Sequence, residues 1–90
     1  MYFMTINKFK PNLNPDKIGR VIPLHISWIR GLIANGKVVQ AGKWGNSGGM
    51  AILMARDISE AEMLLSSDPL IKSGLITFEL EQFHPDVEIK

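Results

Sequence analysis

The chain has 90 residues, of which 46% are hydrophobic and 21% charged, and its formal net charge is +1 at pH 7. This length predicts one domain, and the near-neutral charge argues against a surface for nucleic acid or anionic membrane, which requires clustered Lys and Arg. The absence of cysteine excludes disulfides, thiolate catalysis and zinc–sulfur sites. We expect no signal peptide and no transmembrane segment, and therefore a cytoplasmic location.

The first half of the chain predicts a strand, a helix and a short second strand. Tyr2–Phe9 is rich in β-forming residues and is followed by a segment with two prolines. An apolar stripe at three- and four-residue spacing then predicts a helix, through Ile22, Ile26, Ile29, Leu32 and Ile33. We expect the regular helix to begin near Pro23, with residues 16–21 forming a separate turn or bent lead-in. Asn35-Gly36 ends the helix, and residues 38–41 form the next strand.

The second half begins with a glycine-rich connection over residues 42–49 and a strand over residues 50–55 that is apolar on both faces. The next helix is expected to start with a capping box, in which Ser59 and Glu62 each satisfy a backbone donor of the other. Asp68-Pro69 ends or breaks this second helix.

Residues 75–83 form the last strand, which completes a βαββαβ order within a single α+β domain over residues 1–85, followed by a polar tail over 86–90. This order predicts a ferredoxin-like fold, with an antiparallel sheet of order 4-1-3-2 and both helices on one face. The strand over 50–55 leaves no polar face, so the face without helices also needs cover. We therefore expect a homodimer or a higher assembly.

The topology brings His25 and Asp68 to one end of the sheet, with His25 expected in the first turns of its helix. An aspartate that accepts from one ring nitrogen would leave the other free to move a proton on a substrate. The alternative interpretation is that both residues have structural roles only. His25 would then be a half-buried packing residue, and Asp68 a turn-forming residue before proline.

At this point the chain resembles the YCII-related family of small dimeric α/β proteins over nearly its whole length. The matching motifs are Pro23-Leu24-His25-Ile26, residues 36–42, Ser59-Glu60-Ala61-Glu62, Asp68-Pro69-Leu70 and Gly74-Leu75. The resemblance implies a dimeric α/β barrel whose sheets pack face to face, with an active site at His25 and Asp68. Some members are described as acting on chlorinated hydroxyaromatics, and the fold is similar to that of muconolactone isomerases.

The chain departs from the family pattern where members often carry Arg before the helix proline. Ile22 stands there, and the nearest arginine is Arg20, which becomes a candidate substrate-binding residue. Trp44 in the glycine-rich loop is a second candidate, as a lid over a pocket, although it could equally pack on a partner subunit. The loop does not match a phosphate-binding loop, because it lacks the Gly-Lys-Ser/Thr ending and joins two strands.

Two functional hypotheses remain. The first is an isomerase- or lyase-type enzyme in which His25 and Asp68 move a proton on a small polar or aromatic substrate, with no cofactor. The second is a non-catalytic dimer that binds a small molecule or a protein. An RNA-recognition role is disfavoured because residues 50–55 contain no aromatic side chain for base stacking. No metal site is expected, because His25 and His84 are the only histidines and there is no cysteine.

Overall fold

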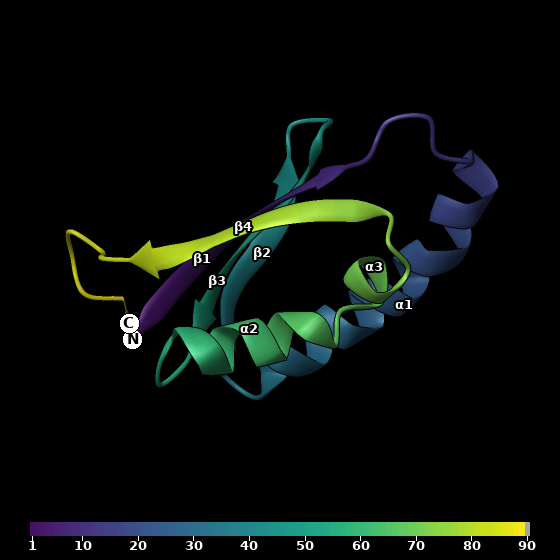
Figure 1. The fold of residues 1–90 in the computed structure, drawn as a ribbon. Coiled ribbons are helices and arrows are strands. Elements are labelled where there is room, and N and C mark those ends of the chain that lie inside the picture. Colours follow the sequence, from purple (N-terminus) through teal and green to yellow (C-terminus); the bar gives the residue numbers. More distant parts are fainter. Residues whose placement is uncertain (90) are drawn as a thin grey trace.

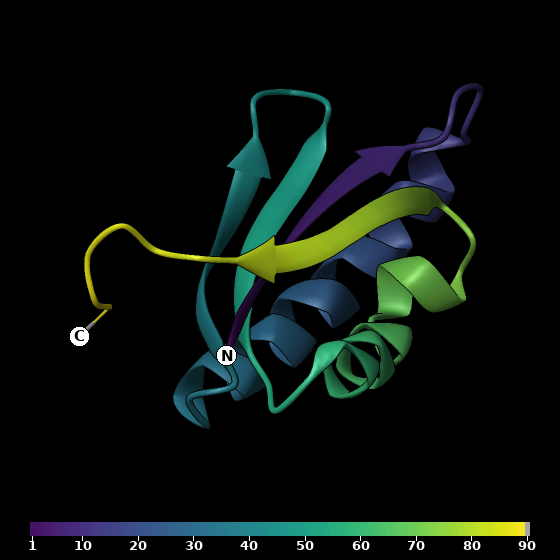
Figure 2. The same cartoon turned by 60° about the vertical axis from the view of Figure 1, so that its left-hand side comes forward.

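The computed structural model describes residues 1–89 as a four-stranded antiparallel sheet with three helices on one of its faces (Figures 1 and 2). In chain order the elements are β1 (Tyr2–Phe9), α1 (Pro15–Ala34), β2 (Val38–Trp44), β3 (Gly48–Met54), α2 (Ile58–Ser66), α3 (Pro69–Lys72) and β4 (Ile76–Phe83). The sheet order is β2-β3-β1-β4. This confirms the ferredoxin-like fold, the sheet order and the placement of the helices on one face.

The first helix is longer than the sequence predicted. α1 begins at Pro15, and the side chain of Asn14 caps it by accepting a hydrogen bond from the Asp16 amide at 2.9 Å. Pro23 therefore lies inside the helix, and the separate lead-in over residues 16–21 was wrong. The proline removes the amide that would bond the Gly19 carbonyl, but both residues are exposed, so solvent can satisfy that carbonyl.

The boundaries of β2 and β3 also differ from those predicted from the sequence. β2 continues to Trp44 and β3 begins at Gly48, so the predicted connection over residues 42–49 contains only three residues outside the two strands, 45–47. Most of the glycine-rich segment is therefore paired backbone. Gly48 must be glycine, because a Cβ atom there would overlap the carbonyl of Asn7 on the neighbouring strand.

Two apolar clusters join the helices to the sheet. The larger is built around Phe3, Leu53 and Leu65, and the smaller around Leu70, Leu75 and Ile76. α1 contributes to both, through Ile29 to the first and through Ile18 and Ile22 to the second. The cavity described below is lined by residues of both clusters.

The cap of α2 was predicted at the wrong residue. Asp57, not Ser59, is the N-cap, and its carboxylate accepts from the Glu60 amide at 2.9 Å. Glu60 reaches back to the Arg56 amide at 3.3 Å, so the reciprocal pair is formed two residues earlier than expected. Ser59 is an exposed residue inside the helix.

We predict that Asp57→Ala lowers the free energy of unfolding by about 1 kcal/mol, because the helix loses its capping acceptor. Ser59→Ala should change it by less than about 0.5 kcal/mol, as for an ordinary surface position. Urea unfolding followed by circular dichroism measures both variants. A larger loss in Ser59→Ala than in Asp57→Ala would contradict the placement of the cap.

Candidate functional site

The site is built around a hydrogen-bonded pair from two different helical segments. His25 lies in the middle of α1, not in its first turns as expected, and Asp68 immediately precedes α3. The Nδ1 atom of His25 lies 2.8 Å from Oδ1 of Asp68. The His25 side chain is 20% exposed and the Asp68 side chain 1%. The carboxylate is therefore shielded from solvent, whereas part of the ring is accessible. The structure thus brings together the two residues singled out in the sequence.

Asp68 is held in place by the backbone that it caps. Its backbone has extended φ/ψ angles of −64° and 124°, and its Oδ1 accepts from the Leu70 amide at 2.9 Å. Pro69 occupies the first position of α3, where a missing amide costs nothing. The same oxygen therefore caps α3 and binds His25. Among residues 1–89, Oδ2 of Asp68 is the one buried side-chain polar atom without a hydrogen-bond partner, and a donor on a bound molecule could satisfy it.

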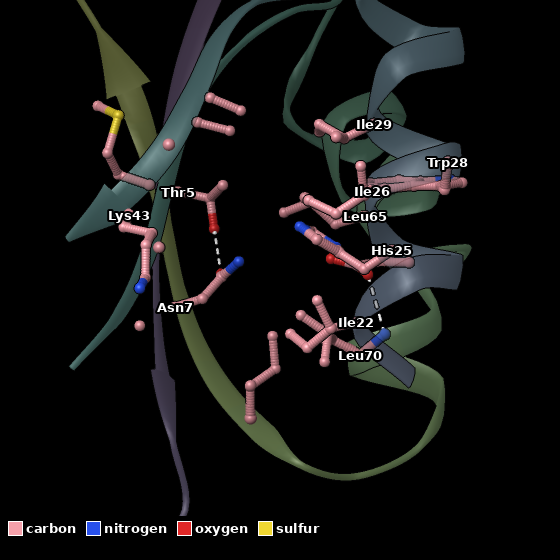
Figure 3. Close-up of a pocket in the computed structure, with 18 of the residues that line it drawn as sticks. Thr5, Asn7, Ile22, His25, Ile26, Trp28, Ile29, Lys43, Leu65 and Leu70 are labelled. Carbon is pink, nitrogen blue, oxygen red and sulfur yellow. Dashed lines mark hydrogen bonds and ion pairs between the residues drawn. The ribbon is translucent and has the colours of Figure 1, made fainter. Parts of the chain in front are cut away.

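This geometry assigns different roles to the two ring nitrogens of His25. Nδ1, facing the carboxylate, carries the hydrogen and donates it, so in the neutral ring Nε2 is the acceptor. Nε2 forms no hydrogen bond with any described residue, and the ring extends from α1 toward the sheet (Figure 3). A base with this arrangement can take a proton from a molecule placed between helix and sheet.

Trp28 supports the pair from one helical turn further along α1. Its indole Nε1 donates to the Ser67 hydroxyl at 2.9 Å, and that hydroxyl donates to the Leu64 carbonyl at 2.7 Å. The rings of Trp28 and His25 lie 5.9 Å apart between centroids, tilted by 36°. This connection ties α1 to the end of α2, directly before Asp68. The sequence analysis assigned no role to Trp28 or Ser67, because their contact joins distant segments.

A cavity of about 380 Å³ separates the helices from the sheet at this point. It exists because small residues occupy the helix-facing side of the central sheet, where Ala41, Ala51 and Gly49 line it. Ile22, Ile29 and Leu65 line the helical side, so most of the wall is apolar. The size and lining suit a compact molecule with one ring.

The sheet wall carries three polar residues that the sequence analysis missed. Thr5 and Asn7 lie on β1, and Lys43 lies on β2 at the edge of the cavity (Figure 3). The signal was present, because strand alternation places Thr5 and Asn7 on the same face as the buried Phe3. Two polar residues at core-facing positions of a central strand are unusual unless they serve a site.

The two other candidates from the sequence lie elsewhere. Arg20 is exposed on α1, and Trp44 is exposed at the end of β2. Neither lines the cavity, and we assign them no role in it. Within residues 1–89 no three His, Asp or Glu side chains gather in a way that could hold a metal ion. None of the described helices has the length and apolarity needed to cross a membrane.

Solved structures with this architecture include two enzymes. One is the 5-chloro-2-hydroxyhydroquinone dehydrochlorinase from Burkholderia phenoliruptrix AC1100 in complex with 2,5-dihydroxybenzoquinone, which is 21% identical, with a TM-score of 0.75 over 93% of this chain and 94% of that chain. The other is a muconolactone isomerase, 15% identical, with a TM-score of 0.76 over 100% of this chain and 97% of that chain. At these identities the likeness establishes the fold alone.

No curated protein sequence matches the chain significantly. The family model of the YCII-related domain, however, matches residues 1–83, which include every strand and helix and both members of the His–Asp pair. This agrees with the motifs recognised in the sequence. The chain belongs to the YCII-related domain family.

Proposed function

We propose that this protein is an acid–base enzyme of the isomerase or lyase type, in which His25 moves a proton on a small, ring-containing molecule bound in the cavity. The observation that carries the proposal is the orientation of His25. Its Nδ1 is bound to a buried carboxylate at 2.8 Å, and its Nε2 has no partner within residues 1–89. Asp68 would orient the ring and stabilise the imidazolium that forms when Nε2 accepts the proton.

The chemistry follows from which groups line the cavity. His25 can remove a proton from carbon and return it at another position, which is an isomerisation, or the substrate can expel a leaving group, which is an elimination. By their names, the two structural neighbours described above carry out one reaction of each kind, a dehydrochlorination and an isomerisation. The apolar wall would hold the ring of the substrate and exclude water from the proton transfer.

We predict that a chlorinated hydroxyhydroquinone or a muconolactone is turned over by the protein, and that His25→Ala lowers kcat/KM by roughly 10²- to 10⁴-fold. His84→Ala is the matched control, because His84 is an exposed histidine beyond β4 and should leave turnover unchanged. Asp68→Asn keeps a good N-cap for α3 but removes the negative charge, so it should lower turnover while the protein stays folded. Liberated chloride and absorbance changes give the rates.

Equal turnover by the wild type and His25→Ala would refute the proposed role of His25. Binding of ring compounds to the wild type, detected as a thermal shift that His25→Ala abolishes, but without turnover of any compound, would favour the non-catalytic binding dimer instead.

We propose further that two copies pair through the sheet face that carries no helices. The strand register places eight residues of β1 and β3 on that face. Lys8 and Gly48 lie at one end of it, and the other six form a band that is apolar except for the tyrosine hydroxyl: Tyr2, Met4, Ile6, Met50, Ile52 and Met54. All are partly or fully exposed in one chain. Exposed Glu79 and Glu81 of β4 flank this band at one edge of the sheet. A band of this kind at the centre of a sheet is typical of an interface.

We predict that the wild type sediments as a dimer and that Met4→Arg sediments as a monomer, because a charge would be buried between the sheets. Met63→Arg is the matched control. It places the same substitution on the exposed side of α2 and should leave the dimer intact. A wild-type monomer in analytical ultracentrifugation, or equal dissociation of both variants, would contradict this arrangement.

A further inference from the structure

The helix-facing side of β1 carries two buried polar residues that the proposed proton transfer leaves without a role. Thr5 is 0% exposed and Asn7 is 8% exposed, and both line the cavity. Polar side chains at such positions are costly to bury unless each polar atom finds a partner. Their presence in the wall opposite His25 therefore calls for an explanation.

The hydrogen bond between them orients the amide of Asn7. The Thr5 hydroxyl donates to Oδ1 of Asn7 at 3.0 Å, which occupies the carbonyl end of the amide. The NH₂ end donates no hydrogen bond to any residue among 1–89, and unlike Oδ2 of Asp68 it keeps accessible surface. Figure 3 shows that this nitrogen is directed into the cavity, toward His25 on the opposite wall. Asn7 thus presents an unused donor to whatever occupies the space between them.

Neighbouring residues restrict the position of the Asn7 amide and favour binding of a negatively charged group next to it. The backbone of Asn7 is bounded by Gly48, where any side chain would overlap the Asn7 carbonyl. Across the sheet, Asn7 pairs with Gly49 and Gly49 pairs with Lys43. Because Gly49 has no side chain, the floor between the amide and the lysine is open. Lys43 forms no ion pair within residues 1–89, so its positive charge is available at the cavity edge.

We propose that Asn7 donates a hydrogen bond to an oxygen of the substrate that becomes negatively charged as His25 removes a proton, with Lys43 adding positive potential at the edge. Thr5 is the positioning residue that keeps the amide nitrogen toward the cavity. This inference rests on the proposed function, because it needs His25 as the base. It adds a group on the sheet wall of the cavity that stabilises the negative charge formed on the substrate oxygen.

The proposal defines the class of substrate. Nε2 of His25 takes a proton from a carbon next to a carbonyl group. The electron pair of the broken C–H bond forms a C=C bond, and the π electrons of the carbonyl move onto its oxygen, which becomes an enolate held by Asn7. The imidazolium then returns the proton at a conjugated carbon, or the enolate expels a leaving group. A cyclic ketone or lactone of one ring, with a hydrogen on the saturated carbon next to its carbonyl group, fits both the reaction and the size of the cavity.

The test uses two probes of similar size and shape, para-nitrophenolate, which carries an anionic oxygen, and para-nitroanisole, which does not. The measured quantity is the ratio of their dissociation constants, obtained by calorimetric titration of each protein. The wild type should prefer the phenolate. Asn7→Leu and Lys43→Met should each reduce that preference, Asn7→Leu by roughly 10- to 100-fold, because a hydrogen bond to a charged oxygen is lost while the ring contacts remain.

Matched controls separate this effect from a general loss of polarity or charge. Asn46→Leu changes an exposed loop asparagine and Lys37→Met an exposed lysine, and neither residue lines the cavity, so both should keep the wild-type preference. Thr5→Val should reduce the preference because the amide can rotate, and Thr5→Ser should restore it by keeping the hydroxyl.

An unchanged preference in Asn7→Leu, with binding of both probes still weakened by His25→Ala, would overturn this inference and leave the proposed function standing. No binding of either probe to the wild type, or binding that His25→Ala does not affect, would overturn both. A variant that loses binding of both probes equally counts against the oxyanion role, because such a loss reports the shape of the cavity and not its charge.

Discussion

The carboxylate of Asp68 connects the local fold of this protein to its site. One oxygen caps α3 and accepts from His25 at the same time, so the position of the histidine ring depends on the start of a four-residue helix. Asp68 is sealed from solvent, whereas the ring is open on one side. Because a charged hydrogen bond is stronger away from water, this arrangement fixes the ring more firmly than an exposed pair would. The buried Oδ2 has no partner within residues 1–89 and adds an acceptor to the same wall.

The cavity results from strand register. In one row across the sheet, Ala41, Ala51 and Thr5 face the helices, and in the next row Lys43, Gly49 and Asn7 do. Small side chains on β2 and β3 therefore leave a hollow beneath α1, while β1 supplies polar groups on its floor. The two apolar clusters pack helix against sheet on either side of this hollow. Nε2 of His25 and the amide nitrogen of Asn7 thus lie on opposite walls of a cavity of about 380 Å³.

Much of this fold could be predicted from the sequence. The β-forming residues predicted both ends of β1 correctly, and the order of the elements along the chain predicted the order of strands in the sheet. Local rules failed where two patterns competed. Asp57 and Ser59 are each followed by glutamate three residues later, so the local pattern fits both, and in the structure Asp57 is the N-cap of α2. The long α1 was missed because packing by Ile18 and Ile22 outweighs the break that Pro23 predicts. His25 and Asp68 were found because topology and family motifs coincide there. Strand alternation could have placed Asn7 on the core-facing side of β1, but its position in the same row as Gly49 and Lys43 follows only from the register of the folded sheet.

The most direct test of this account is the tautomer of His25, read from long-range proton–nitrogen NMR correlations at a pH where the ring is neutral. Donation from Nδ1 to Asp68 predicts a hydrogen on Nδ1 and a bare Nε2 in the wild type. Exposed His84 provides an internal reference in the same spectrum. A hydrogen on Nε2 of His25, or rapid averaging between both forms like that of His84, would contradict the claim that Asp68 holds the ring with its basic nitrogen toward the cavity.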